Sequence, residues 1–573
     1  MWPFTPSYLT VVQQKRDQRA HALDSAPSTF TEEHQLFTKA SATEIVSRIR
    51  GGEWTASQVL EAYIARAKMA HEHTNCLTEI MFDSARERAK ALDIEFVSSG
   101  NVKGPLHGVP VSIKEQFEIT GFDTSVGFTR WANNPAKINA DIVDILLAAG
   151  AVPFVKTNIP QTMFAFECSN PLWGRTTNPY NDHYTSGGSS GGEAALLAMD
   201  GSPLGIGTDI GGSLRIPTAY CGIYSLKPGS QRVTYGGGKG PNPGFEGIKS
   251  VAGPMGRSVQ DLELAARTIF GVQGRNHDIA PIPFRNITSR PMSKFGYYTS
   301  DGFVKASPAC KRAVLDAVKA LQQQGHECVE IEIPSAPKAF YIFAGLSSAD
   351  GYRTMFSHIG PDPMEPAIRL VSITPKLPRL VRSLLAWIVE HALGDEYFAE
   401  GLRVVRPKSV QEYTQLVAER DNFTSNFYKE VWEKYGIDGI IAPVQPIPQL
   451  PHGGCNDFLP IGASTAYYNL IDLPVGTLPV TRVDAKIDQM TDEWWQGPGH
   501  GSKLLETGLF KGPKALYQPE QINGMPVGVQ IIGRRWEDEK VLAMMKEVDE
   551  ALGANRGFGP GAWDAFSKPA ENQ

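Results

Sequence analysis

The sequence has few cysteines, and their spacing does not suit a metal site or a disulfide framework. Six cysteines are scattered over 573 residues, and no two of them form a C-x-x-C pair. Structural zinc sites and disulfide-rich secreted domains both rely on closely spaced cysteines. We therefore expect no metal, no disulfide framework and a reducing compartment.

Long apolar runs and an excess of basic charge are also missing. No window approaches the roughly 20 apolar residues of a membrane-spanning helix, and the N-terminal residues lack the basic-then-apolar order of a signal peptide. Lys and Arg number 55 against 61 Asp and Glu, which gives a net charge of −6. Because nucleic-acid-binding proteins need a basic face, we expect no nucleic-acid partner. We expect an intracellular protein that is cytoplasmic or peripherally associated with a membrane, and not secreted.

Helical and strand patterns alternate along the chain. Residues 141–158 have a helical pattern, then a glycine, then a strand pattern, and this alternation favours an α/β layer fold. No linker separates two domains, so we expect one large α/β domain. Further strands are predicted at 109–113, 438–444, 474–481 and 525–532, and a final helix at 537–553.

One stretch is rich in glycine and serine but contains no histidine or cysteine. It is residues 187–217, GGSSGGEAALLAMDGSPLGIGTDIGGSLRIP. A nucleophilic serine usually has a histidine as its base, so a nucleophile here would need a different base. A phosphate-binding loop is disfavoured because no lysine follows the glycines as in the P-loop motif. A nucleophile elbow around Ser190 matches G-x-S-x-G, but glycine-rich chains often contain that short pattern by chance.

A third interpretation combines two serines with a lysine. The glycines before Ser213 let backbone N–H groups converge, as an oxyanion hole requires. Ser189 lies in a second glycine loop, and Lys114 ends the apolar strand at 109–113. Burial would keep that lysine neutral and able to accept a proton. Structural turns, and a surface lysine at a strand end, are the alternatives that the residues alone leave open.

Residues 187–218 resemble the signature of the amidase signature family. The match runs through GGSSGG, the small-residue run, GTDIGGS and LRIPT, and the likeness extends from about residue 38 to 553. It implies a large, mixed, twisted β-sheet covered on both sides by α-helices. It also implies a serine hydrolase without a cofactor, which cleaves carboxylic or fatty acid amides to acid and amine through an acyl-enzyme.

The resemblance also assigns roles to residues. Lys114 would be the base, Ser189 the relay, preceded by a cis peptide bond, and Ser213 the nucleophile. The family's oxyanion-hole amides correspond to Ile210, Gly211, Gly212 and Ser213. Met163 matches the wall of the acyl pocket, and Ser190, Asp209 and Arg215 are expected to support the loops.

Two branches of the family compete as models for the substrate: enzymes for small amides, such as fungal acetamidase, and enzymes for fatty acid amides. The run at 377–393 resembles the membrane-cap region of the second branch more closely. Its apolar residues follow one helix face, with basic residues nearby. Such a helix either packs on the protein's own core or contacts lipid peripherally, and the resemblance supports the second option. An amidotransferase-type subunit, which needs partner subunits, and a scaffold without activity are further alternatives.

We expect the ligand to be a small-molecule amide, and an N-acyl amide in particular. A homodimer is one option for the assembly.

The predicted division of the chain has an N-terminal arm, an amidase domain with two insertions, and a tail. These parts are a loosely held arm at 1–36, the amidase domain at 37–560 with its signature core at about 107–230, a cap-like helical insertion at about 370–405, an irregular insertion at about 484–520, and the tail at 561–573.

Overall fold

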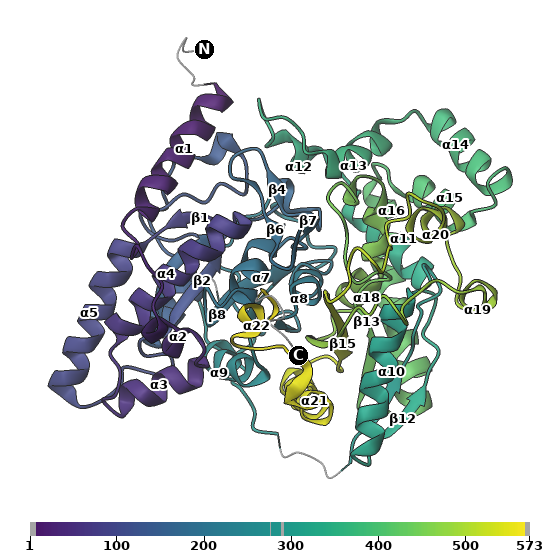
Figure 1. Ribbon diagram of the computed structural model, residues 1–573. Helices are drawn as coiled ribbons and strands as arrows, with labels where there is room; N and C mark the ends of the chain where they lie inside the picture. The colour runs from purple at the N-terminus through teal and green to yellow at the C-terminus, as the bar shows by residue number, and fades with distance from the viewer. Residues whose placement is uncertain (1–6, 276, 288–291, 568–573) are drawn as a thin grey trace.

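A mixed sheet of 11 strands forms the centre of the molecule, as the computed structural model shows for residues 7–275, 277–287 and 292–567 (Figure 1). Neighbours pair in parallel along β3-β2-β8 and β13-β11-β12, and antiparallel elsewhere. In sheet order the strands are β1 (Leu77–Ile80), β3 (Val152–Thr157), β2 (Pro110–Lys114), β8 (Leu204–Asp209), β10 (Val251–Gly256), β9 (Tyr224–Lys227), β14 (Val475–Arg482), β15 (Pro526–Ile532), β13 (Gly439–Pro443), β11 (Lys294–Tyr297) and β12 (Glu327–Glu330).

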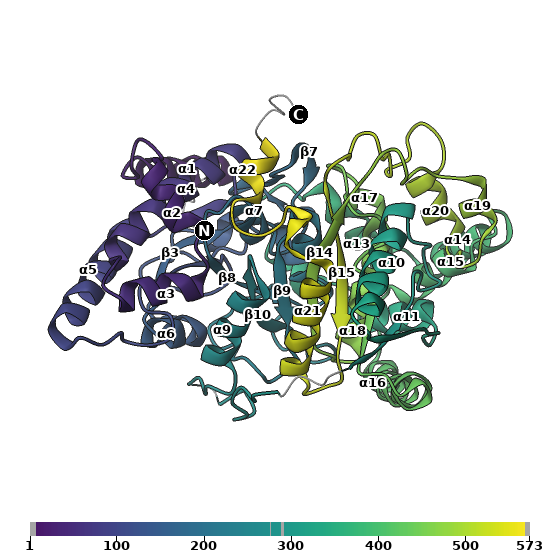
Figure 2. The same ribbon diagram turned by 60° about the horizontal axis from the view of Figure 1, so that its bottom comes forward.

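Helices cover both faces of this sheet, which confirms the predicted fold class (Figure 2). Adjacent residues of β10 point to opposite faces. Met255 belongs to the same apolar cluster as Leu197, and Gly256 lies against Leu262. One face carries α9 (Val259–Ile269), α10 (Pro308–Gln323) and α21 (Asp538–Leu552), and the other carries α7 (Gly191–Ala198), α8 (Arg215–Cys221) and α18 (Ala463–Leu470).

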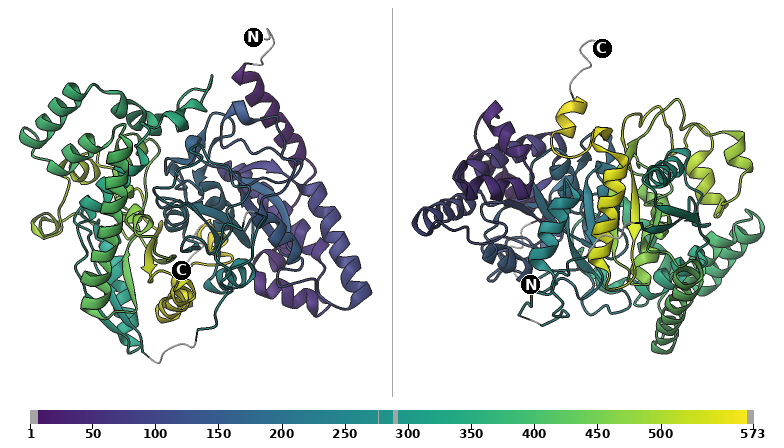
Figure 3. Two further views of the ribbon diagram at one scale, coloured as in Figure 1. Left: turned by 180° about the vertical axis from the view of Figure 1, so that it is seen from behind. Right: turned by 90° about the horizontal axis from the view of Figure 1, so that it is seen from below.

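The predicted central strands and the last helix lie where the sequence places them. Strands β2, β13, β14 and β15 fall within one or two residues of the predicted ranges, and α21 ends just before Gly553. Every residue of β2 and β3 is buried, as expected for parallel strands covered on both faces. Viewed from below, the yellow α21 crosses the middle of the sheet, between the N-terminal and the green parts of the chain (Figure 3).

The N-terminal segment is packed, so the expectation of a loosely held arm is wrong for its described residues. Helix α1 (Tyr8–Leu23) lies against the edge of the sheet near β1. Its Lys15 is buried and forms ion pairs with Glu79 at 2.6 Å and Asp123 at 2.8 Å. A second helix, α2 (Glu32–Thr38), packs on α4 (Ala56–Thr74).

Both predicted insertions contain helices. Residues 370–405 hold the end of α13 (Arg369–Ile373), then α14 (Arg379–His391) and α15 (Glu396–Val404). The region at 484–520 is less irregular than expected, because it forms α19 (Asp492–Gln496) and α20 (Lys503–Phe510). Within the ranges that the structure describes, no helix has both the length and the apolar character needed to cross a membrane.

Candidate active site

Lys114 lies at the end of β2 with no exposed surface. Its Nζ is 2.7 Å from the hydroxyl of Ser189 and 2.7 Å from that of Thr208. Burial lowers the pKa of Lys114 to about 7, although the negative charges of Asp209 and Glu193 act in the opposite direction. A large fraction of this lysine is therefore neutral near pH 7 and able to accept a proton.

Ser189 and Ser190 connect the lysine to the loop that carries Ser213. The peptide bond between Gly188 and Ser189 is cis, as the family resemblance implies. Ser190 precedes α7, and its backbone N–H donates to the carbonyl of Ser213 at 3.2 Å. No hydrogen bond joins the hydroxyls of Ser189 and Ser213 in the described part of the chain. The loop of Ser189 and the loop of Ser213 are therefore held together through the backbone, and Ser189 contacts the lysine directly.

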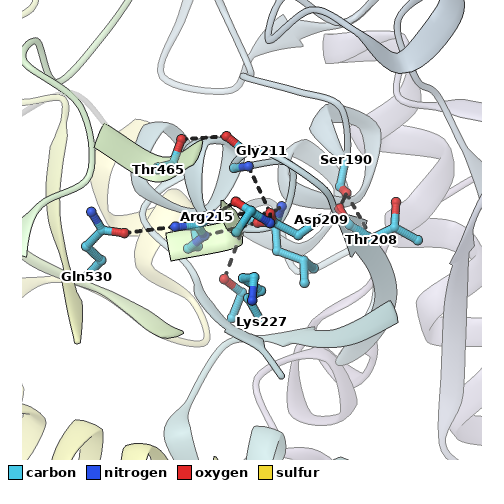
Figure 4. Close-up of polar contacts among 12 residues, drawn as sticks. Ser190, Thr208, Asp209, Gly211, Arg215, Lys227, Thr465 and Gln530 are labelled. Atoms are coloured by element: carbon cyan, nitrogen blue, oxygen red, sulfur yellow. Dashed lines mark hydrogen bonds and ion pairs between the residues drawn. The ribbon is translucent and has the colours of Figure 1, made fainter. Parts of the chain in front are cut away.

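Asp209 and Arg215 form a buried ion pair, with 3.1 Å between Nε and the carboxylate (Figure 4). The Asp209 carboxylate also accepts the backbone N–H groups of Gly212 and Leu214, at 2.8 and 3.0 Å. Burial alone would raise the pKa of Asp209, but Arg215 and Asn469 help to lower it to about 2. This permanently charged carboxylate fixes the loop between β8 and α8.

The loop held by Asp209 leaves three backbone amides without a partner. Among the described residues, the N–H groups of Ile210, Gly211 and Ser213 have no acceptor. The fourth predicted amide, that of Gly212, donates to Asp209 instead. Unpaired amides beside a cavity are suited to bind a developing oxyanion. The geometry thus leaves three of the four predicted amides free for such a role.

The path of this loop requires glycine at 212. Gly212 has a φ of 131°, and a Cβ there would lie 2.3 Å from Oγ1 of Thr465 and 2.7 Å from Ile216. The hydroxyl of the same Thr465 lies 2.7 Å from the carbonyl oxygen of Gly211 and 2.9 Å from that of Gly462, so α18 packs closely on this loop (Figure 4).

An apolar cavity of about 190 Å³ opens beside Ser213. Its wall includes Met163, as predicted, together with Gly188 and Ile210–Gly212. Most of the remaining wall was not predicted, because it comes from helices and loops distant in sequence. These unpredicted residues include Phe303, Phe340, Phe343, Tyr352, Tyr397, Phe398 and Leu402.

The cap-like helices lie beside this cavity. Helix α15 supplies part of the cavity wall and packs against α14, which lies at the outer edge of the molecule (Figure 1). The apolar face of α14 is exposed: Leu380 is 85% and Leu384 58% exposed. The sequence left open whether this face packs on the core, and the structure shows that it does not.

The fold and the comparisons with known proteins define the class of protein as an enzyme that hydrolyses amides. The family model described as Amidase matches residues 58–542. The chain therefore belongs to the amidase family, also called the amidase signature family.

Several relatives match almost the whole chain. It is 31% identical to a fatty-acid amide hydrolase 1 from Sus scrofa, over 95% of this chain and 92% of the relative. It is 32% identical to an acetamidase from Emericella nidulans, over 91% of each. A solved structure of a fatty acid amide hydrolase superposes with a TM-score of 0.80 at 28% identity, covering 97% of this chain and 92% of that one.

Proposed function

We propose that this amidase cleaves N-acyl amides, preferring long acyl chains, with Ser213 as nucleophile, Ser189 as proton relay and Lys114 as base. One observation supports the proposal above all. Three free backbone amides, the Ser213 side chain and an apolar cavity occur together. Next to them, a buried lysine of lowered pKa is hydrogen-bonded to Ser189.

The reaction begins with proton transfer. Neutral Lys114 accepts the hydroxyl proton of Ser189 as Ser189 accepts that of Ser213, and the Ser213 oxygen attacks the amide carbon. The free amides of Ile210, Gly211 and Ser213 stabilise the oxyanion. The proton then returns through Ser189 to the nitrogen of the leaving amine, and the C–N bond breaks. Water hydrolyses the resulting acyl-enzyme with the same groups acting as base.

The apolar cavity is an argument for the proposed preference for long acyl chains. Its wall is mostly apolar and includes aromatic side chains from α11 (Ala336–Ser347) and α15, so an alkyl chain would replace water there favourably. A series of N-acyl amides of one amine, from acetyl to long-chain acyl, tests this preference. We expect kcat/KM to rise with acyl length, and a maximum at acetyl would instead assign the enzyme to the acetamidase type.

Replacing Ser189 by alanine should slow turnover by about 10²–10⁴-fold, the usual contribution of positioned proton transfer. The substrate KM should change little, because Ser189 acts on the proton and not on the acyl chain. Single-turnover kinetics would measure the loss in the acylation step. Ser190→Ala is the matched control, and a greater loss in that variant than in Ser189→Ala would show that the wrong serine has been assigned.

The exposed face of α14 is proposed to contact lipid peripherally and to bring acyl substrates to the cavity. Replacing Leu384 and Leu385 by glutamate should weaken liposome binding and raise KM for long-chain substrates, while short soluble amides are hydrolysed as before. Co-sedimentation with vesicles measures the binding. The matched control replaces Ile94 and Val97, which are exposed on α5 (Phe82–Ser99), by glutamate. Equal effects of the two double variants would contradict a specific role for α14.

A further inference from the structure

The mechanism above uses one of the two hydrogen bonds of Lys114. The other one leads away from Ser189 into a buried polar chain. Nζ of Lys114 is 2.7 Å from Oγ1 of Thr208, and that oxygen is 2.6 Å from Oε1 of Gln116. Thr208 and Gln116 are both buried, in β8 and just after β2. Neither residue faces the substrate cavity.

The direction of each hydrogen bond in this series, from Lys114 through Thr208 to Gln116, follows from the partners of Gln116. The side-chain nitrogen of Gln116 lies 3.2 Å from the backbone carbonyl of Lys239, and it also donates to the hydroxyl of Tyr235. A carbonyl oxygen can only accept, so the amide nitrogen of Gln116 must be on that side. Its amide oxygen therefore faces Thr208, and this oxygen can also only accept.

The orientation of Thr208 follows in turn. A hydroxyl has one proton, and the proton of Thr208 is directed at the amide oxygen of Gln116. Towards Lys114, Thr208 can then offer only lone pairs. It must accept an N–H of the lysine, and it cannot donate to the lysine's nitrogen.

A neutral amine has two N–H bonds and one lone pair, and the lone pair is what accepts a proton. We propose that Thr208 and Gln116 are positioning residues that hold one N–H of neutral Lys114, so that its lone pair is directed at Ser189. This inference rests on the proposed function, because it assigns the orientation of the same base. Without the hydrogen bond to Gln116, the hydroxyl of Thr208 would be free to rotate and to donate its proton to the lone pair of Lys114.

Four variants test the proposal: Gln116→Met, Thr208→Val, their combination, and Thr208→Ser. The first two should each lower kcat about 10–100-fold while KM stays within about twofold, because proton transfer is impaired and binding is not. Thr208→Ser retains the hydroxyl and should recover most of the rate. The double variant should be no slower than Thr208→Val alone, since both changes act through one proton.

The outcomes separate this inference from the proposed function. Full activity in Gln116→Met, or losses that multiply in the double variant, would overturn the inference. If Gln116→Met does not fold, as judged by its thermal unfolding, the contrast between Thr208→Val and Thr208→Ser decides the question alone, and equal rates in that pair would overturn it. Lys114→Ala is the reference: if that variant keeps the full rate, the proposed function itself fails.

Discussion

Replacing Ser213 by alanine should reduce amide hydrolysis to background and prevent formation of any acyl-enzyme, while the fold is retained. Ser213 is half-buried at the cavity, and its hydroxyl makes no hydrogen bond within the described chain. Its loss therefore leaves no buried partner unsatisfied. The nucleophile has no substitute, so we expect kcat/KM to fall by on the order of 10⁴-fold or more.

Mass spectrometry of the protein during turnover, together with thermal unfolding, would measure both parts of this expectation. Ser98→Ala serves as a control for a serine remote from the site, since Ser98 lies exposed near the end of α5. An acyl adduct trapped on the Ser213→Ala protein would show that another residue is the nucleophile. A large fall in melting temperature would show that Ser213 is needed for folding instead.

Replacing Lys114 by alanine should lower kcat/KM by about 10²–10⁴-fold and remove its dependence on pH. The direction of this pH dependence follows from the lowered pKa of Lys114. Lys114 is protonated and unable to act as base below pH 7, and it becomes neutral above about 7. In the wild type, activity should therefore rise about tenfold from pH 6 to pH 8, as the neutral fraction increases. The alanine variant should be slow and flat over the same range.

Other titrating groups surround this lysine and need to be separated from it. Burial raises the pKa of Glu193 to about 7, and its carboxylate is hydrogen-bonded to Ser112 and Thr157 rather than to a cation. The thiol pKa of nearby Cys168 is raised by burial, and Asp209 stays charged. If the rise between pH 6 and pH 8 persisted in Lys114→Ala, a group other than Lys114, with Glu193 as the first candidate, would be responsible for it. The measurement needs a substrate that does not itself ionise.

The residues proposed for catalysis could be selected from the sequence more readily than the residues that surround them. Lys114, Ser189 and Ser213 lie in short contiguous motifs, and glycines at the required positions mark the loops. The strands that support them were predictable because fully buried strands have continuous apolar runs, such as the run that precedes Lys114.

The wall of the apolar cavity was not predictable in the same way. Phe340 and Phe343 on α11 meet Tyr397 on α15 and Met163 from the signature region only through the tertiary fold. Aromatic residues at helical spacing are equally typical of an ordinary core, so no local pattern distinguishes a cavity wall.

The burial of polar side chains could not be predicted from the sequence patterns either. Helix α1 has no apolar stripe, and so the sequence predicted a loose arm. It is held instead by the buried cation of Lys15, paired with Glu79 and Asp123. The hydrogen bonds from Lys114 through Thr208 to Gln116 could not be predicted for a similar reason. Hydrophobic periodicity says nothing about the direction in which a buried hydroxyl donates.

The most direct test of a Ser213 nucleophile activated by neutral Lys114 is the rate of fluorophosphonate labelling as a function of pH, with the modified residue identified by peptide mass mapping. We predict a single adduct on Ser213, formed at a rate that rises through about pH 7 in the wild type and is slow and independent of pH in Lys114→Ala. An adduct on any other residue, or the same pH profile in both proteins, would contradict the account.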